Sequence, residues 1–303
     1  MLRDLIIFGA GASFGSDIAV TPPLGYKLFD DLVIFNPEGW GKIDTNLAGI
    51  FRKDFEIGMK ELSQSNLHAL PPLQRAMALY FFRFIPSKSN LYIRLAERIK
   101  KKNWQGAIAT FNYERLLELS LLSEGFRPVA GRESTSSNEI EICFPHGCCH
   151  LFCTSVRGTA QGISFSGTNV STNGPIEVIS DSLAFRDRII NDAFPPVMSY
   201  FIPSKITTSG ASFIKNHRTR FSELVSQSSI IAVVGLCVRP HDVHIWEPLS
   251  ETSAKIIYCS GKQGGAEFKI WAEENRKDKE NIIIPYYFFD GFEKLCFAIE
   301  LIE

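Results

Sequence analysis

The sequence predicts an α/β protein with a Rossmann-like, mostly parallel sheet, helices on both faces of that sheet and an inserted helical subdomain. Near its start, the apolar run 5–8 ends at a glycine pair, which is typical of a buried strand followed by a tight turn. In the C-terminal third, β-branched runs alternate with a helical pattern. Strands that alternate with helices form a parallel sheet, because each crossover places a helix on one of its faces.

The composition is that of an ordinary globular protein. With 303 residues, 45% of them hydrophobic and 21% charged, the chain can bury a large core in one domain or two unequal ones. A formal net charge of −1 gives no general attraction to nucleic acid or to a membrane surface. The longest uncharged apolar runs, such as 282–289, are far shorter than the roughly 20 residues that a membrane helix needs. We therefore expect a cytoplasmic protein with neither a membrane nor a specific nucleic-acid partner.

The seven cysteines are an odd number in a chain too large to depend on disulfides. We expect them to be reduced and, for the most part, to act as small buried hydrophobes.

The first half of the chain divides into a strand and a long helical segment. After the strand at 5–8, the sequence at 21–25 contains two prolines and a glycine and breaks regular structure. From 26 to about 102, apolar residues recur at three- or four-residue spacing, which predicts helices. We place a helical subdomain at 25–102, inserted into a Rossmann-like domain that is formed by 1–24 and 103–303.

The second half returns to the α/β pattern. A strand is predicted at 106–111, and a helical stretch at 114–122 stops at Gly125. The segment 151–226 is rich in Ser, Thr, Gly and Asn, and it predicts only short strands and a helix near 184–190. The remaining predicted elements are strands at 230–235, 255–258 and 282–284 and a helix at 266–275.

Four polar segments each follow a predicted strand, at 9–13, 110–114, 144–147 and 235–242. Because open α/β sheets bind ligands at the carboxyl ends of their strands, we expect these segments to form one site. In the first of them, the glycines permit a tight turn and Ser13 is expected to open a helix whose N–H groups favour an anion. The dinucleotide pattern G-x-G-x-x-G is incomplete, since Phe14 stands at its third glycine.

In their order, these motifs resemble the sirtuin superfamily. In that family a G-A-G-x-S turn holds the NAD phosphates, a T-Q-N-x-D segment places an Asn beside the nicotinamide ribose, and an H-G pair supplies the catalytic His. The matching residues are the segment 9–13, Asn112 and His146. The residues that the resemblance places against NAD are Gly9, Ala10, Gly11, Ala12, Ser13, Thr110, Phe111, Gly235 and, at the adenine-side ribose, Ser260.

Departures from the deacylases of this family point to a different activity. The chain has no C-x-x-C pair, whereas the deacylases carry a zinc module with two, and its second motif reads Thr-Phe-Asn-Tyr-Glu. Leu236 and Cys237 replace the small residue and Ser that follow the late strand's glycine. These features are similar to the zinc-less, sirtuin-like NAD hydrolases of bacterial anti-phage defence, in which NAD+ is the substrate.

The resemblance implies an NAD+ glycohydrolase that needs no metal. Asn112 would hold water and the ribose hydroxyls, and His146 would act as a general base or orient the nucleophile. The products would be nicotinamide and ADP-ribose or a cyclised form, and depletion of NAD+ would serve anti-phage defence. Control would come from a homo-oligomer or from a partner such as a hexameric translocase ATPase. An NAD-dependent deacylase or ADP-ribosyltransferase and a non-catalytic module that senses NAD or ADP-ribose stay open as alternatives.

Each motif also has a purely structural interpretation. The glycines can form a simple strand-to-helix turn, Asn112 can cap the helix that follows it, and His146 can be a hydrogen-bonded loop residue. Asp242 is expected to cap a helix beginning near 243 rather than touch the nucleotide, with His241 and His244 near it on the surface. The cluster Cys148, Cys149, His150 and Cys153 offers zinc ligands, but adjacent cysteines rarely fit a closed tetrahedral site, which disfavours zinc there.

Overall fold

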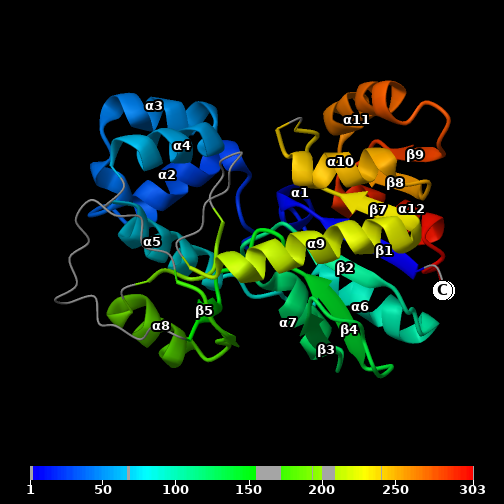
Figure 1. Ribbon diagram of the computed structural model, residues 1–303, viewed down its shortest axis with the longest axis horizontal. Coiled ribbons are helices and arrows are strands. Elements are labelled where there is room, and N and C mark those ends of the chain that lie inside the picture. Colours follow the sequence, from blue (N-terminus) through cyan, green and yellow to red (C-terminus); the bar gives the residue numbers. More distant parts are fainter. Residues whose placement is uncertain are drawn as a thin grey trace.

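A computed structural model describes residues 3–66, 69–154, 172–192, 194–199, 209–239 and 241–302. Its centre is a seven-stranded sheet with the order β3-β4-β2-β1-β7-β8-β9, in which every pairing is parallel (Figure 1). The strands are β1 (Arg3–Phe8), β2 (Ala107–Thr110), β3 (Arg127–Ala130), β4 (Glu139–Cys143), β7 (Ser228–Val234), β8 (Lys255–Cys259) and β9 (Asn281–Ile284). The predicted Rossmann-like α/β fold is confirmed.

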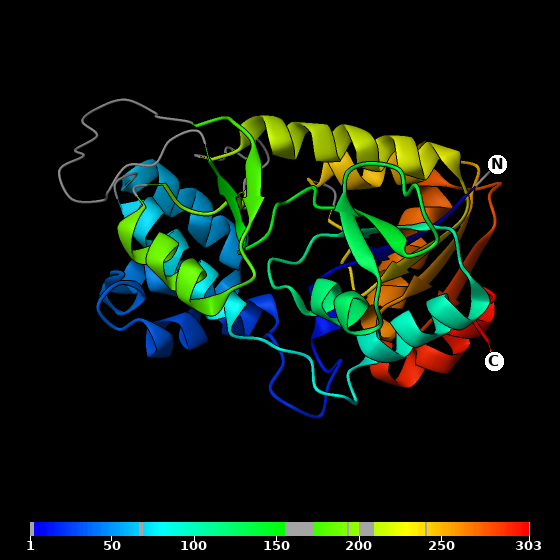
Figure 2. The ribbon, with the colours of Figure 1, turned by 90° about the horizontal axis from the view of Figure 1, so that it is seen from below.

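Helices cover both faces of this sheet, and α9 lies on the side opposite α6 and α12 (Figure 2). Successive side chains of a strand point to opposite faces. Accordingly, Ile6 and Phe8 pack with α6 (Leu91–Lys102), α7 (Leu116–Ser123) and α12 (Phe288–Ala298). Leu5 and Ile7 pack with α9 (Ala211–Gln227), α10 (Val243–Glu251) and α11 (Lys262–Asn275). Because β1 is buried on both faces, its apolar residues are consecutive, which is why the sequence reveals it.

A second lobe is built from helices around an aromatic core (Figure 1). Its elements are α2 (Gly25–Phe35), the 3-10 helix η1 (Trp40–Lys42), α3 (Thr45–Lys53), α4 (Phe55–Ser65) and α5 (Leu70–Phe82). Phe29 and Phe51 stack with ring centroids 5.0 Å apart, and Trp40 meets Phe51 edge-on. The last helix of the predicted insertion, α6, lies instead beside α7 and α12 against the sheet.

The segment after β4 adds a small pair of antiparallel strands, β5 (Leu151–Cys153) and β6 (Ile176–Val178), and helix α8 (Ser182–Asn191). The predicted helix near 184–190 is therefore confirmed. It packs on the helical lobe, since the rings of Phe185 and Phe82 stack 3.7 Å apart. The part of this segment at 155–171 lies outside the described residues.

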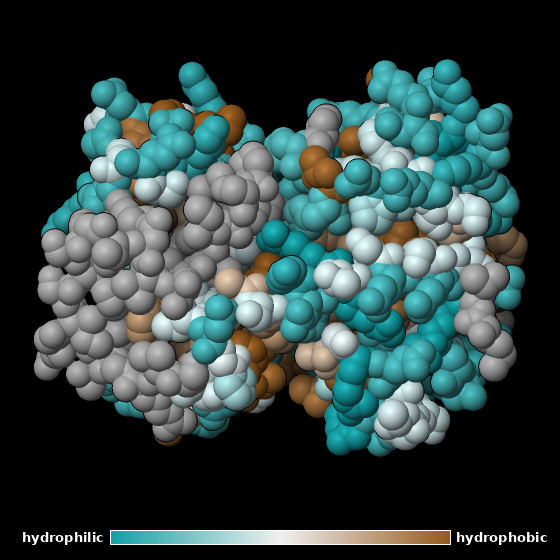
Figure 3. Space-filling model, in the orientation of Figure 1, coloured by the Kyte–Doolittle hydropathy of each residue, from teal (hydrophilic) through white to brown (hydrophobic). Residues whose placement is uncertain are grey.

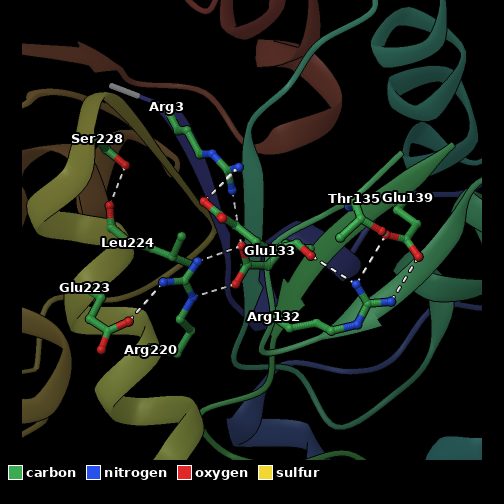
Figure 4. Close-up of polar contacts among 10 residues, drawn as sticks. Arg3, Arg132, Glu133, Thr135, Glu139, Arg220, Glu223, Leu224 and Ser228 are labelled. Atoms are coloured by element: carbon green, nitrogen blue, oxygen red, sulfur yellow. Dashed lines mark hydrogen bonds and ion pairs between the residues drawn. The ribbon is translucent and has the colours of Figure 1, made fainter. Parts of the chain in front are cut away.

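Buried ion pairs fasten α9 to the sheet (Figure 4). The fully buried carboxylate of Glu141 on β4 accepts two hydrogen bonds from Arg220 on α9, at 2.7 and 3.0 Å. Three residues before Arg220, His217 accepts a hydrogen bond at Nδ1 from the backbone N–H of Phe144, 3.0 Å away. The charge pair thereby also positions the chain just ahead of His146.

All seven cysteines are free thiols, and all but Cys237 are buried, as expected. Among the described residues, the helices are too short or too polar for any of them to span a membrane.

Candidate functional site

The central strands end level with one another. Phe8 pairs with both Thr110 and Val234, and Val234 pairs with Cys259. The residues that follow these ends are Gly9, Phe111 and Asn112, Gly235, and Ser260. The parallel register therefore brings the predicted segments to one edge of the sheet. They meet beside β1, where the strand order reverses, because β2 lies on one side of β1 and β7 on the other.

At the centre of this edge, the two glycine turns pack directly on each other. The N–H groups of Gly9 and Gly11 donate to the carbonyls of Val234 and Gly235, at 2.9 and 2.8 Å. Gly235 has a φ of 62°, and a Cβ there would overlap the backbone nitrogen of Ala12. The glycines thus permit backbone contact between β1 and β7, and these two N–H groups already have backbone partners.

The prediction that a helix begins at Ser13 is wrong. A single turn, α1 (Ala10–Ser13), begins earlier and ends where it was expected to begin, and Phe14 after it is extended with φ −64° and ψ 117°. So short a turn has little of the dipole that a long helix directs at an anion. The reason is tertiary, because the Ser13 side chain is drawn into a buried polar network.

Ser13 is the centre of that network and is 1% exposed. Its hydroxyl donates to the Glu114 carboxylate at 2.5 Å, lies 2.9 Å from the hydroxyl of Tyr92, and accepts from the Asn112 amide nitrogen at 2.9 Å. The second oxygen of Glu114 accepts from the N–H of Leu116. Three segments far apart in sequence therefore meet at one serine.

The network fixes how Asn112 is oriented. Since the single Ser13 hydrogen goes to Glu114, Ser13 can only accept from Asn112, so Nδ2 faces Ser13 and Oδ1 faces away. Oδ1 is buried without a hydrogen-bond partner among the described residues. The alternative that Asn112 caps a helix is wrong, because α7 begins at Leu116 with Arg115 at its N-cap position. A buried amide oxygen without a donor is costly unless a ligand or water supplies one.

Burial dominates the acid–base properties of this network. It raises the pKa of the Glu114 carboxyl, against the hydrogen bonds from Ser13 and Leu116, which lower it. Burial also raises the pKa of the Tyr92 hydroxyl well above its usual range, so Tyr92 stays protonated and donates to Ser13.

The His146 ring packs near the two residues that flank Asn112 in sequence. The ring of Phe111 meets His146 edge-on at 4.9 Å between centroids, and that of Tyr113 lies roughly parallel at 6.4 Å. Gly147 has a φ of 76°, and a Cβ there would overlap the carbonyl of Val197. The His146 backbone is thus held by packing, with its ring against the second motif.

A second imidazole completes this part of the site. His146 Nε2 and His244 Nε2 are 2.9 Å apart, so one donates to the other. His244 was expected on the surface but is half-buried against His146 and Phe111. Asp242 does stand at the N-cap of α10, yet its side chain makes no capping hydrogen bond there, and its carboxylate lies within 4.8 Å of both histidine nitrogens. The predicted N-cap position of Asp242 is therefore confirmed, but its side chain does not form the capping hydrogen bond.

The sequence did not single out Glu56, which the helical lobe contributes at the start of α4. Its carboxylate pairs with Arg239 at 2.9 Å and with His241 Nε2 at 3.2 Å. These contacts cross between the two lobes, which Figure 3 shows as separate masses with a notch between them. A lone Glu in the first turn of an amphipathic helix carries no local signal of such a partner.

The cysteine cluster next to His146 is buried. The Cys148 thiol donates to the Tyr113 carbonyl at 3.1 Å and lies 3.2 Å from His150 Nδ1. Burial lowers the pKa of His150 to about 3 and raises that of the neighbouring Glu118 to about 8. The cluster therefore holds the second motif in place through hydrogen bonds to the Tyr113 carbonyl.

Ser260 follows β8 directly and is half-buried at the same edge as Gly235. A cavity of about 800 Å³ lies elsewhere, along β9 and α12, between residues such as Ile282, Lys294 and Phe297. None of the predicted site residues lines it.

No protein-family model and no curated protein matches the chain. Among solved structures it is similar to Sir2Tm bound to a propionylated peptide, with 12% identity, a TM-score of 0.47, and coverage of 99% of this chain and 94% of that one. It is also similar to a Sir2 homologue–NAD complex, with 14% identity, a TM-score of 0.47 and coverage of 99% and 90%. A Sir2 homologue mutant in complex with ADP-ribose gives 15% identity, 0.41, and 91% and 93%. Identities this low say nothing about activity.

Proposed function

We propose that this protein is an NAD+ glycohydrolase. The reaction cleaves the bond between C1′ of the ribose and the nicotinamide nitrogen. The bond's electron pair leaves with nicotinamide, water adds to C1′, and a proton is released, so that NAD+ and water give nicotinamide, ADP-ribose and H+. Positive charge develops on the ribose as the bond breaks, and the site must therefore offer oxygen acceptors and a positioned water.

The observation that carries the proposal is the unpartnered Oδ1 of Asn112. It is fixed in direction by Ser13 and Glu114 and lies at the carboxyl edge of the sheet, where ligands bind in open α/β folds. A water molecule or a ribose hydroxyl would supply the missing donor. Because the oxygen is held in place before the substrate arrives, it can stabilise developing charge without rearranging.

His146 is the proposed general base or orienting group. The Phe111 and Tyr113 rings hold its imidazole next to the Asn112 segment, and His244 contacts its Nε2. An imidazole can take a proton from water or from a ribose hydroxyl near neutral pH. The chemistry so described needs no metal.

The remaining predicted contacts would hold the dinucleotide along the same edge. The glycine turn at 9–13 and Gly235, which pack on each other, would flank the pyrophosphate at this edge, and Ser260 follows the next strand toward the adenine side. Thr110 and Phe111 are the first two residues of the second motif and would contact NAD+ beside Asn112. We further propose that NAD+ depletion in the cytoplasm serves anti-phage defence, and that a homo-oligomer or a hexameric translocase ATPase controls the activity. The motif resemblance supports these two points.

The test is nicotinamide release from NAD+ by the purified chain, followed with and without an acyl-lysine peptide, together with NAD+ binding by calorimetry. We expect peptide-independent release that is lost in Asn112→Ala and His146→Ala. His241→Ala is the matched control, since His241 pairs with Glu56 rather than with His146. Release that survives both site substitutions would refute the assignment. Release that requires the peptide would show a deacylase, and binding without release by the wild type would show a sensing module.

A further inference from the structure

We propose that His146, His244 and Asp242 bind one divalent transition-metal ion of the Zn2+ class, with a fourth coordination position open. Two imidazoles and a carboxylate are a ligand set that suits such ions, and an open position is typical of sites that are not purely structural. The three ligand atoms lie within 4.8 Å of one another. Nothing in the proposed reaction requires the ion, so binding would be a separate property of the site.

The geometry is close to that of a tetrahedral ion. With metal–nitrogen bonds of about 2.0–2.1 Å, two imidazole nitrogens on one tetrahedral ion lie about 3.3 Å apart. The Nε2 atoms of His146 and His244 are 2.9 Å apart, so they need to separate by only about 0.4 Å.

The surroundings hold the ligands and leave a way in. His146 and Asp242 are 7% and 5% exposed, whereas His244 is half-buried and therefore partly accessible to solvent. The Phe111 ring packs edge-on against both imidazoles, at 4.9 and 6.2 Å between centroids. Buried ligands of fixed orientation favour binding because less freedom is lost when the ion arrives.

Two other groups of potential ligands are less suitable. The group of Glu56, His241 and Asp242 includes a carboxylate, that of Glu56, which already forms ion pairs with the Arg239 guanidinium at 2.9 Å and with His241 at 3.2 Å. Cys148 and Cys149 are adjacent and 0% exposed, so an ion has no open route to them.

If the proposed function holds, the ion would inhibit nicotinamide release, because a metal-bound Nε2 of His146 cannot accept a proton. This consequence rests on the proposed function, whereas binding of the ion does not. The binding test below therefore contains no NAD+, so that the two proposals can fail separately.

The test is a titration of the chelator-treated full chain with Zn2+ against a chromophoric competitor, and with Co2+ by absorption spectroscopy. We expect one ion per chain, a Co2+ spectrum without a thiolate charge-transfer band, and a higher melting temperature with metal. In His244→Ala and Asp242→Asn we expect affinity to fall by about 100-fold or more, because even outer-shell changes cost about 10–100-fold. His241→Ala and Cys149→Ser should bind as the wild type does.

The proposal is overturned if the wild type binds no ion, if His244→Ala binds as tightly as the wild type, or if a thiolate band appears. Loss of binding in His241→Ala would place the ion at Glu56 instead. Circular dichroism of the metal-free variants separates lost ligands from lost folding, and the Co2+ spectrum of the wild type needs no variant.

Discussion

Removal of the Ser13 hydroxyl gives the sharpest test of the buried network. Ser13→Ala removes a hydrogen-bond partner from three buried groups, namely the Asn112 amide, the Tyr92 hydroxyl and one oxygen of Glu114. A buried group that loses a hydrogen-bond partner costs about 1–3 kcal/mol. Because these groups relax together, we expect a loss of about 4 kcal/mol in the free energy of unfolding, near the upper end for single substitutions. At about 2 °C per kcal/mol, the melting temperature would fall by about 8 °C.

Ser120→Ala is the matched control. Ser120 is 0% exposed, and its hydroxyl donates only to the Leu116 carbonyl within the same helix, at 2.7 Å. Alanine favours helix, so this substitution should change the free energy of unfolding by less than about 0.5 kcal/mol. Urea denaturation followed by circular dichroism measures both variants. Equal destabilisation by the two substitutions would refute the view that Ser13 organises the site.

Two further predictions concern the packing and the buried titratable groups. Gly235→Ala should lower the melting temperature sharply, since φ is 62° and the new Cβ would overlap the backbone of the facing turn. Gly25→Ala is the control and should leave the melting temperature nearly unchanged, because its new Cβ meets nothing within 4 Å. Equal melting temperatures of the two variants would contradict the close contact at Gly235. Stability should peak near pH 6.5. Below that pH, protonation of His150 and His217, whose pKa values burial lowers from 6.5 to about 3 and about 4, favours the unfolded chain. Over the shared range from 4.5 to 6.5, Glu118 opposes them, because its pKa is raised from 4.5 to about 8, but the two histidines outweigh it. Above pH 6.5 only Glu118 acts among these three, so stability falls toward pH 8. Glu118→Gln should reduce that fall in urea titrations at a series of pH values, and a fall of unchanged size in the variant would exclude Glu118 as a cause.

The sheet could be predicted because its signals are local. β1, β7 and β8 are buried on both faces, so each appears as a continuous apolar run with a turn after it. The partner of a helix is not local information. The periodicity of α6 predicts a helix, but only the three-dimensional structure places it against α7 and α12.

The site was predictable as a set of segments and not as a network. Parallel strands with level ends bring their following residues together, so Asn112 and Gly235 share an edge as expected. Contacts across long sequence distances left no trace in the sequence. Tyr92 reaches Ser13 from 79 residues away, and His244 reaches His146 from 98. The same contacts explain why the turn after Gly9 does not continue as a helix.

Steady-state kinetics of Asn112→Ala test the central claim most directly, with Ser260→Ala as the comparison. If the Asn112 oxygen acts on the reacting ribose, its removal should lower kcat for nicotinamide release by about 100-fold or more and leave NAD+ affinity nearly unchanged. Ser260→Ala should instead raise KM with kcat retained, because the role proposed for Ser260 is a binding contact at the adenine-side ribose, away from the reacting bond. An Asn112→Ala protein that folds and releases nicotinamide at the wild-type kcat would contradict the account.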